Sequence, residues 1–267
     1  MDQLYGWYVS SYARDIHEYM KNLEMTRIPV NLSDNRSIGY RPALIDWIRG
    51  VAEKQKLPTT VVHLAVYLLD VLATNHEFSK FESFQCAHAC LQIAAKNKND
   101  QCVHEPDVNN WEDEIVEIDD SDDDDHSYTD RNGNYDKSKF RKKSFAEREI
   151  SILEFFNWRV NWPTAANFAE YYKIIAVAYN DEHPDMSRRE LGIHVRSSID
   201  RFLDLTLTVD LAKYRPSMTA AACLLAARSQ WLIDPVWPGI FEYWTGYKRH
   251  DLLTIAEKLV KIDEQRE

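Results

Sequence analysis

The chain has 267 residues, of which 45% are hydrophobic and only seven are glycine. Its formal net charge is −11, but residues 105–130 hold 13 acidic and no basic residues, which leaves the remainder at +2. A near-neutral body argues against a broad surface for nucleic acid, and no apolar run reaches membrane-spanning length. The N-terminus lacks signal-peptide features. Four cysteines outside any paired-spacing motif are typical of reduced thiols in the cytoplasm or nucleus.

An N-terminal helix is expected over residues 5–24. Apolar side chains recur there at spacings of three and four and predict one apolar face: Tyr8, Tyr12, Ile16, Tyr19 and Leu23. That face packs either on the helix's own domain or on a partner protein, and the pattern does not choose between them. Residues 25–39 are rich in Pro, Asn, Ser and Gly and form a polar connection.

Three consecutive helices are expected between Arg41 and Lys96, each with an apolar stripe at helical spacing. Pro42 suits the first turn of one helix, because a first-turn residue needs no N–H donor. Pro58 opens the next helix in the same way. The third helix has small residues that let neighbouring helices approach closely, as a central helix requires: Ala87, Ala89, Ala94 and Ala95.

An acidic segment interrupts this pattern at about 97–138. It is centred on residues 119–125 and offers too little apolar surface to offset the entropy of ordering it. A helix resumes over 139–158, and Pro163 marks a boundary. Further helices are expected at 164–179, 187–209, 217–231 and 248–263. Strand-like alternation is almost absent, so the chain is predicted to be all-helical.

Three short motifs are specific when taken together. Residues 40–47 read Tyr-Arg-Pro-Ala-Leu-Ile-Asp-Trp, residues 63–66 read His-Leu-Ala-Val ahead of Asp70, and residues 94–96 read Ala-Ala-Lys. The last is echoed by Ala-Ala-Arg at 226–228, a weak internal repeat. In these motifs the chain resembles the cyclins, the regulatory subunits of cyclin-dependent kinases, and the first box resembles the J type most closely.

The resemblance implies an all-α fold of two tandem five-helix cyclin boxes. The expected divisions are an N-terminal helix and linker at 1–39, box 1 at 40–162 with the acidic insertion at about 97–138, and box 2 at 163–267. It further implies a heterodimer with a cyclin-dependent Ser/Thr kinase in cell-cycle control, with no enzymatic activity and no cofactor of its own. Neither nucleic acid nor membrane is expected as a partner. The alternative is a helical adaptor of cyclin fold that binds proteins without activating a kinase.

The resemblance also assigns kinase contacts. In the family, a Lys that ends the third helix and a Glu in the fifth bind the backbone of the kinase's regulatory helix, and Lys96 and Glu149 match them. Apolar contacts are expected around that pair: Tyr12, Ile16, Ile93, Leu153, Trp158 and Val160. Asn97 replaces a family aromatic, and Lys98 and Asn99 replace two acids. We therefore expect a contact that is smaller, or shifted towards a particular kinase.

Two further groups follow from the family pattern. Arg41 and Asp70 match an ion pair that ties the first two helices together, and two buried charges must pair because an isolated one is very costly. A possible docking patch for substrates or inhibitors comprises Tyr40, Leu44, Trp47 and Phe84. Several family residues of that patch are replaced here, so we expect a different short motif, or none, to dock.

No residue pattern indicates catalysis or a metal centre. Cys86 and Cys90 share a helical face, and His63 and His88 lie on neighbouring expected helices. No second pair completes a metal site, and we expect these four as core residues. The sequence contains no glycine-rich phosphate loop, no nucleophile elbow and no paired-carboxylate motif.

Overall fold

The computed structural model describes most of the chain outside the acidic segment. The described ranges are 11–31, 39–76, 78–99, 145–178 and 180–266. Within them the chain forms helices and no strand, and an isolated β-bridge joins His183 to Met186. The predicted all-α fold is confirmed. None of the described helices has the length and apolar character needed to cross a membrane.

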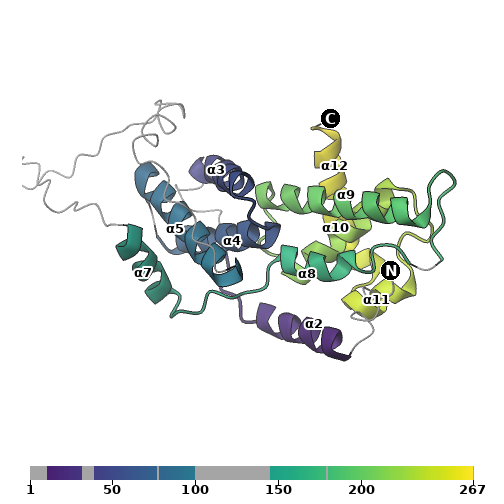
Figure 1. Ribbon diagram of the computed structural model, residues 1–267, viewed down its shortest axis with the longest axis horizontal. Helices are drawn as coiled ribbons and strands as arrows, with labels where there is room; N and C mark the ends of the chain where they lie inside the picture. The colour runs from purple at the N-terminus through teal and green to yellow at the C-terminus, as the bar shows by residue number, and fades with distance from the viewer. Residues whose placement is uncertain (1–10, 32–38, 77, 100–144, 179, 267) are drawn as a thin grey trace, which may run out of the picture.

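The first box is built around its second and third helices, α4 (Thr59–Asn75) and α5 (Lys80–Asn99), which pack side by side. Its other described helices are α3 (Arg41–Lys54) and α7 (Phe145–Phe155) (Figure 1). Every residue of α4 from Val61 to Leu72 is buried, because α4 packs against α3, α5 and the second box. The small residues of α5 are buried as well, as its close approach to α4 requires. The expected insertion at 97–138 lies outside the described residues, except for 97–99, which continue α5.

The second box surrounds one central helix. Its helices are α8 (Ala165–Lys173), α9 (Arg188–Thr208), α10 (Pro216–Gln230), α11 (Gly239–Thr245) and α12 (Arg249–Glu264). Helix α10 packs against all four of the others and is buried from Pro216 to Arg228 except at Met218. Helix α11 is not among the helices expected from the sequence. It begins after Pro238 and ends at Gly246, which has a left-handed backbone with φ of 77°.

Helix α8 ends at Lys173, six residues before the expected end at 179. Side chains bond the backbone groups that would continue it. The carbonyl of Ala176 accepts a hydrogen bond from the buried guanidinium of Arg228 at 3.0 Å. The N–H of Ala178 donates to the carboxylate of Asp181 at 2.6 Å. Tertiary hydrogen bonds therefore override the helical pattern at this point.

The N-terminal helix is α2 (Ser11–Glu24), and residues 1–10 lie outside the described chain. Helix α2 packs against α8 and α10 of the second box. The ring Nε2 of His17 lies 3.1 Å from the hydroxyl of Tyr172, and the buried Glu24 accepts hydrogen bonds from the N–H and hydroxyl of Ser217 at 3.0 and 2.6 Å. These contacts dock α2 on its own chain.

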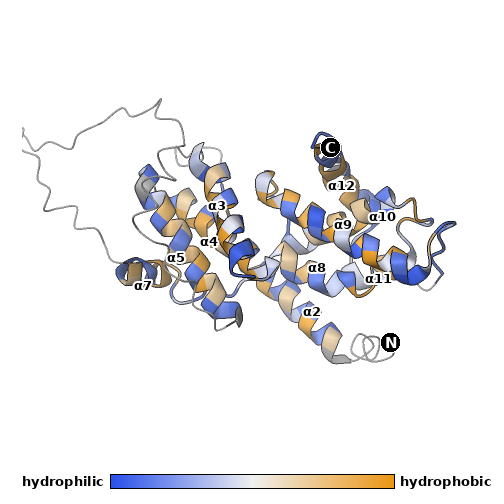
Figure 2. Ribbon diagram, turned by 45° about the horizontal axis from the view of Figure 1, so that its top comes forward, coloured by the Kyte–Doolittle hydropathy of each residue, from blue (hydrophilic) through white to orange (hydrophobic). Residues whose placement is uncertain are grey.

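The apolar face expected for α2 is not its buried face. Tyr19 is 62% exposed and Ile16 is half-buried, whereas the polar His17 and Glu24 point inward. In Figure 2, α2 carries hydrophobic and hydrophilic residues along its length, as an amphipathic helix does. Of the two alternatives for the apolar face, the exposed Tyr19 does not fit packing on its own domain, because buried hydrogen bonds of His17 and Glu24 set the rotation of the helix.

Two arginines of α3 join the boxes. Arg41 Nη1 donates to the carbonyl of Leu207 at 2.8 Å, and Arg49 Nε lies 2.8 Å from the carboxylate of Asp204. Both partners belong to α9, and the Leu207 side chain packs into the core of the first box. These contacts fix α3 against α9.

Candidate functional site

Lys96 and Glu149 form an ion pair on the surface of the first box. Lys96 Nζ lies 2.8 and 2.9 Å from the two carboxylate oxygens of Glu149. Lys96 lies in the last turn of α5 and Glu149 on α7, and these helices pack side by side (Figure 1). Their side chains are 43% and 19% exposed. Although 53 residues separate them in sequence, the structure brings together the two residues that the resemblance singles out.

This pair has unused capacity for further hydrogen bonds. An ammonium group has three donors and a carboxylate accepts at about four positions, so the bonds between Lys96 and Glu149 leave some of each free. Exposed ion pairs stabilise a fold by only about 0–1 kcal/mol. The pair therefore contributes little to folding stability. Its free donors and acceptors are chemically suited to bind a C=O and an N–H group of another molecule.

Apolar side chains on α7 and directly after it are exposed. Trp158 is 66% exposed, and Ile150 is 48% exposed one residue after Glu149. Leu153, one turn further along α7, is half-buried. The helical path is not continued after α7, because Asn157 and Trp158 have left-handed backbones with φ angles of 49° and 61°.

Sequence reasoning missed Ile150 as a contact candidate. Its signal is its spacing of three residues from Leu153, which places both side chains on neighbouring positions of one helical face. An isoleucine at such a position on an exposed helix contributes apolar surface next to the charged pair.

Two of the expected contact residues belong to the core. Ile93 and Val160 are buried in the first-box cluster and present almost no surface to a partner. They support α5 and the segment after α7 from beneath. Ile16 is half-buried on α2, and in both views α2 and α7 lie along the same edge of the molecule (Figures 1 and 2). The side chain of Tyr12 lies outside the described residues.

Arg41 and Asp70 form a bidentate pair. Arg41 Nε and Nη2 lie 2.8 and 2.9 Å from the two oxygens of Asp70, and both side chains are largely buried. Burial raises the pKa of Asp70, and the guanidinium of Arg41 opposes that shift. Because Arg41 also bonds to Leu207, the pair connects α3 to α9 as well as to α4. The pair therefore connects three helices, whereas the resemblance implies a connection between two.

The possible docking patch is mostly covered. Leu44 and Phe84 are buried, and Trp47 is half-buried with its ring 6.4 Å from that of Phe84 in an edge-to-face contact. Tyr40 is half-buried beside them. Only Tyr40 and Trp47 of the four residues therefore offer appreciable surface to a docking peptide.

Three thiols and two imidazoles in the described part of the chain belong to the core. Cys86, Cys90 and Cys223 are free and buried, and burial raises the pKa of the Cys90 and Cys223 thiols, which keeps them protonated and unreactive. Burial lowers the pKa of His63 to about 3 and that of His88 to about 4. Across the described ranges, no three His, Cys, Asp or Glu side chains cluster as a metal site would.

Comparison with known proteins gives consistent matches along the chain. Residues 15–161 match the family model of the cyclin N-terminal domain, and residues 163–267 match that of the cyclin C-terminal domain. The chain is 28% identical to Cyclin-J of Xenopus laevis over 260 residues and 26% identical to Cyclin-J of Homo sapiens over 259 residues, 95% of this chain in each case. These matches confirm the resemblance and the tandem arrangement of the two domains.

The similarity extends to another cyclin type. The chain is 26% identical to Cyclin-A1 of Xenopus laevis over 249 residues, which is 91% of this chain and 51% of that protein. The alignments with the two Cyclin-J proteins cover 62% of their length. The chain therefore spans about three fifths of the length of these Cyclin-J relatives.

Proposed function

The chain belongs to the cyclin family, and on that premise we propose that it binds and activates a cyclin-dependent Ser/Thr protein kinase. Cyclins are regulatory subunits rather than enzymes. The observation that carries the proposal is the exposed pair of Lys96 and Glu149, held by two packed helices of the first box.

The chemistry of the pair suits the backbone of a kinase helix. The ends of a helix leave up to four N–H and four C=O groups without intrahelical partners. Lys96 would donate to such carbonyls, and Glu149 would accept from such N–H groups. Bonds to backbone groups do not depend on the partner's side chains, so the pair supplies affinity while its surroundings supply selectivity.

The exposed apolar residues would add most of the contact area. Burying a side chain such as that of Trp158 or Ile150 in an interface contributes about 1.5–3 kcal/mol. Lys98 already has a partner within the chain, because its Nζ donates to the side chain of Asn161 at 2.7 Å. On this proposal the apolar contact centres on Ile150 of α7 and on Trp158, the exposed residues.

Activation follows from differential binding. Phosphoryl transfer by protein kinases requires a Lys–Glu ion pair between a strand and a mobile regulatory helix of the kinase. A partner that binds only the inward position of that helix shifts the population to the active state. Shifting a 1:99 equilibrium to 99:1 takes about 5.5 kcal/mol of differential binding. By this proposal the chain acts in cell-cycle control, in the nucleus or cytoplasm.

The test is co-purification of the chain from cell extract, followed by assay of histone phosphorylation in the eluate. The variant Lys96→Ala/Glu149→Ala is compared with Arg201→Ala/Asp263→Ala. The control removes another ion pair that joins two helices, at 3.0 Å and with similar exposure of 40% and 10%, but in the second box.

We expect kinase activity with the wild type and the control and its loss with the Lys96/Glu149 variant. Absence of kinase from all three eluates contradicts the proposal. A kinase that is held but inactive favours the adaptor, which keeps the contact without its effect on the regulatory helix.

A further inference from the structure

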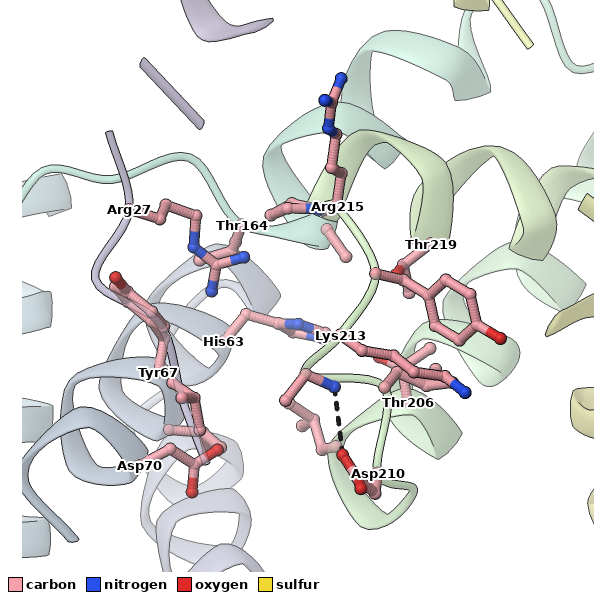
Figure 3. Close-up of a pocket in the computed structure, with 18 of the residues that line it drawn as sticks. Arg27, His63, Tyr67, Asp70, Thr164, Thr206, Asp210, Lys213, Arg215 and Thr219 are labelled. Atoms are coloured by element: carbon pink, nitrogen blue, oxygen red, sulfur yellow. Dashed lines mark hydrogen bonds between the residues drawn. The ribbon is translucent and has the colours of Figure 1, made fainter. Parts of the chain in front are cut away.

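A cavity of about 270 Å³ lies between the two boxes. Most of its lining comes from three parts of the chain: residues 27–30 after α2, one face of α4, and residues 209–215 between α9 and α10. Figure 3 shows the guanidinium of Arg27 and the ring of His63 on one wall, with the loop that carries Asp210 and Lys213 opposite. The cavity is separate from the surface around Lys96 and Glu149.

Two nitrogen atoms at this cavity lack hydrogen-bond partners. His63 is 95% buried, and its Nε2 has no partner in the described part of the chain. The Nε of Arg27 is buried without a partner as well, while its guanidinium lies 4.0 Å above the ring of Tyr67. Buried polar atoms of folded proteins are almost always satisfied, so each such orphan requires an explanation.

The carboxylates that line the cavity already have partners. Glu24 accepts hydrogen bonds from Ser217, and Asp70 accepts two from Arg41. Asp210 accepts a hydrogen bond from the N–H of the second residue after it, at 3.2 Å. Burial lowers the pKa of Arg27, and Tyr67 together with the carboxylates of Glu24 and Asp70 opposes that shift.

Three basic side chains line the same cavity without a carboxylate partner in the described part of the chain. Within the described ranges no carboxylate forms an ion pair with Arg27, Lys213 or Arg215. Lys213 and Arg215 lie at the exposed rim and Arg27 lies deeper. Four basic and three acidic side chains line the cavity, and this excess of positive charge around orphaned nitrogen atoms favours an anionic ligand.

We propose that this cavity binds a phosphate group, which accepts hydrogen bonds from Arg27 and from the Nε2–H of His63. Guanidinium groups match phosphate geometry through two parallel N–H donors. The neutral imidazole of His63 supplies a donor in its Nε2–H tautomer. Small-molecule pockets occupy about 300–1,000 Å³, so a cavity of about 270 Å³ suits a phosphate with a short attached group. Free inorganic phosphate and a phosphoserine side chain share this chemistry.

The ligand would touch both boxes at once. Arg27 belongs to the linker, His63 to the first box and Lys213 to the second. A ligand that binds only the folded arrangement stabilises it. The inference is independent of the proposed kinase contact, because no kinase takes part in its test.

The test is isothermal titration calorimetry on the full chain at constant ionic strength, with inorganic phosphate and a phosphoserine pentapeptide as probes. Removing a charge-assisted hydrogen bond weakens binding at least about tenfold, so Arg27→Gln is expected to raise the dissociation constant by that factor. Lys213→Gln/Arg215→Gln, at exposed positions, is expected to raise it severalfold. The control Arg249→Gln/Lys258→Gln removes the same charge from the exposed face of α12 and should leave it unchanged.

Binding of phosphate alone identifies a free anion as the ligand, and tighter binding of the phosphopeptide identifies a modified protein partner. Either result supports the site, provided that the cavity variants weaken the binding of that probe. No binding of either probe by the wild type overturns the proposal, as does equal weakening by the control. Should Arg27→Gln fail to give a native circular dichroism spectrum, the Lys213/Arg215 variant decides, and unchanged affinity there overturns the site.

Discussion

Replacing Arg228 is expected to destabilise the second box more than any surface change. Its side chain is fully buried and pairs with Asp181, which is 2% exposed. Its guanidinium also donates to three backbone carbonyls, those of Ala176, Pro235 and Val236, at 2.8–3.0 Å. Arg228→Met keeps much of the apolar stem but leaves Asp181 charged and buried without a counter-charge. Breaking a buried pair from one side costs about 3–5 kcal/mol.

The magnitude gives a sharp test by equilibrium urea denaturation. We expect Arg228→Met and Asp181→Leu each to lower the free energy of unfolding by about 3–5 kcal/mol. The double variant should cost less than the sum of the two, because it leaves no unpaired charge. Arg201→Met is the control, since it breaks the more exposed pair with Asp263. Single variants that cost less than about 1 kcal/mol, or strict additivity, would refute this account.

Two further predictions concern binding and pH. Trp158→Ala should weaken kinase binding at least about tenfold in surface plasmon resonance, yet change the unfolding free energy by no more than about 0.5 kcal/mol, because the residue is exposed; equal binding would contradict its role. Burial lowers the pKa of His17 to about 4 from 6.5. The unfolded chain therefore takes up this proton first, and stability is lost as pH falls from 6.5 to 4, by about 1.4 kcal/mol per pH unit. His17→Gln should reduce that slope in urea titrations without abolishing it, because burial also lowers the pKa of His63 and His88; an unchanged slope would contradict the contribution of His17.

The internal repeat shows where sequence pattern stops being informative. Residues 94–96 and 226–228 place Lys96 and Arg228 at corresponding ends of two alanine-rich helices. Lys96 is on the surface, whereas Arg228 is fully buried. The difference arises because segments distant in sequence, around Asp181 and Pro235, cover the end of α10 and accept its hydrogen bonds. The sequence around residues 226–228 does not predict that these distant segments cover the end of α10.

Helices with clear boundary signals were predictable. Pro42 and Pro58 stand at the starts of α3 and α4, where the missing N–H costs nothing. Helix α11 has only seven residues, too few for a hydrophobic period to be recognised, and its evidence lies in Pro238 and Gly246 at its ends. The choice of Lys96 and Glu149 as one site followed from the resemblance alone, since no spacing rule relates residues 53 apart; their ion pair was not predicted.

The position of Glu149 depends on helix packing rather than on chain connection. One residue earlier, Arg148 donates to the side chain of Gln85 on α5 at 2.8 Å. One turn later, Ile152 is buried in the first-box core, which fixes the rotation of α7. Because α7 is anchored to α5 on both sides of Glu149, the carboxylate reaches Lys96 whatever length of chain joins the two helices. A long acidic segment between them is thus compatible with an intact pair, since each doubling of loop length costs only about 0.6 kcal/mol.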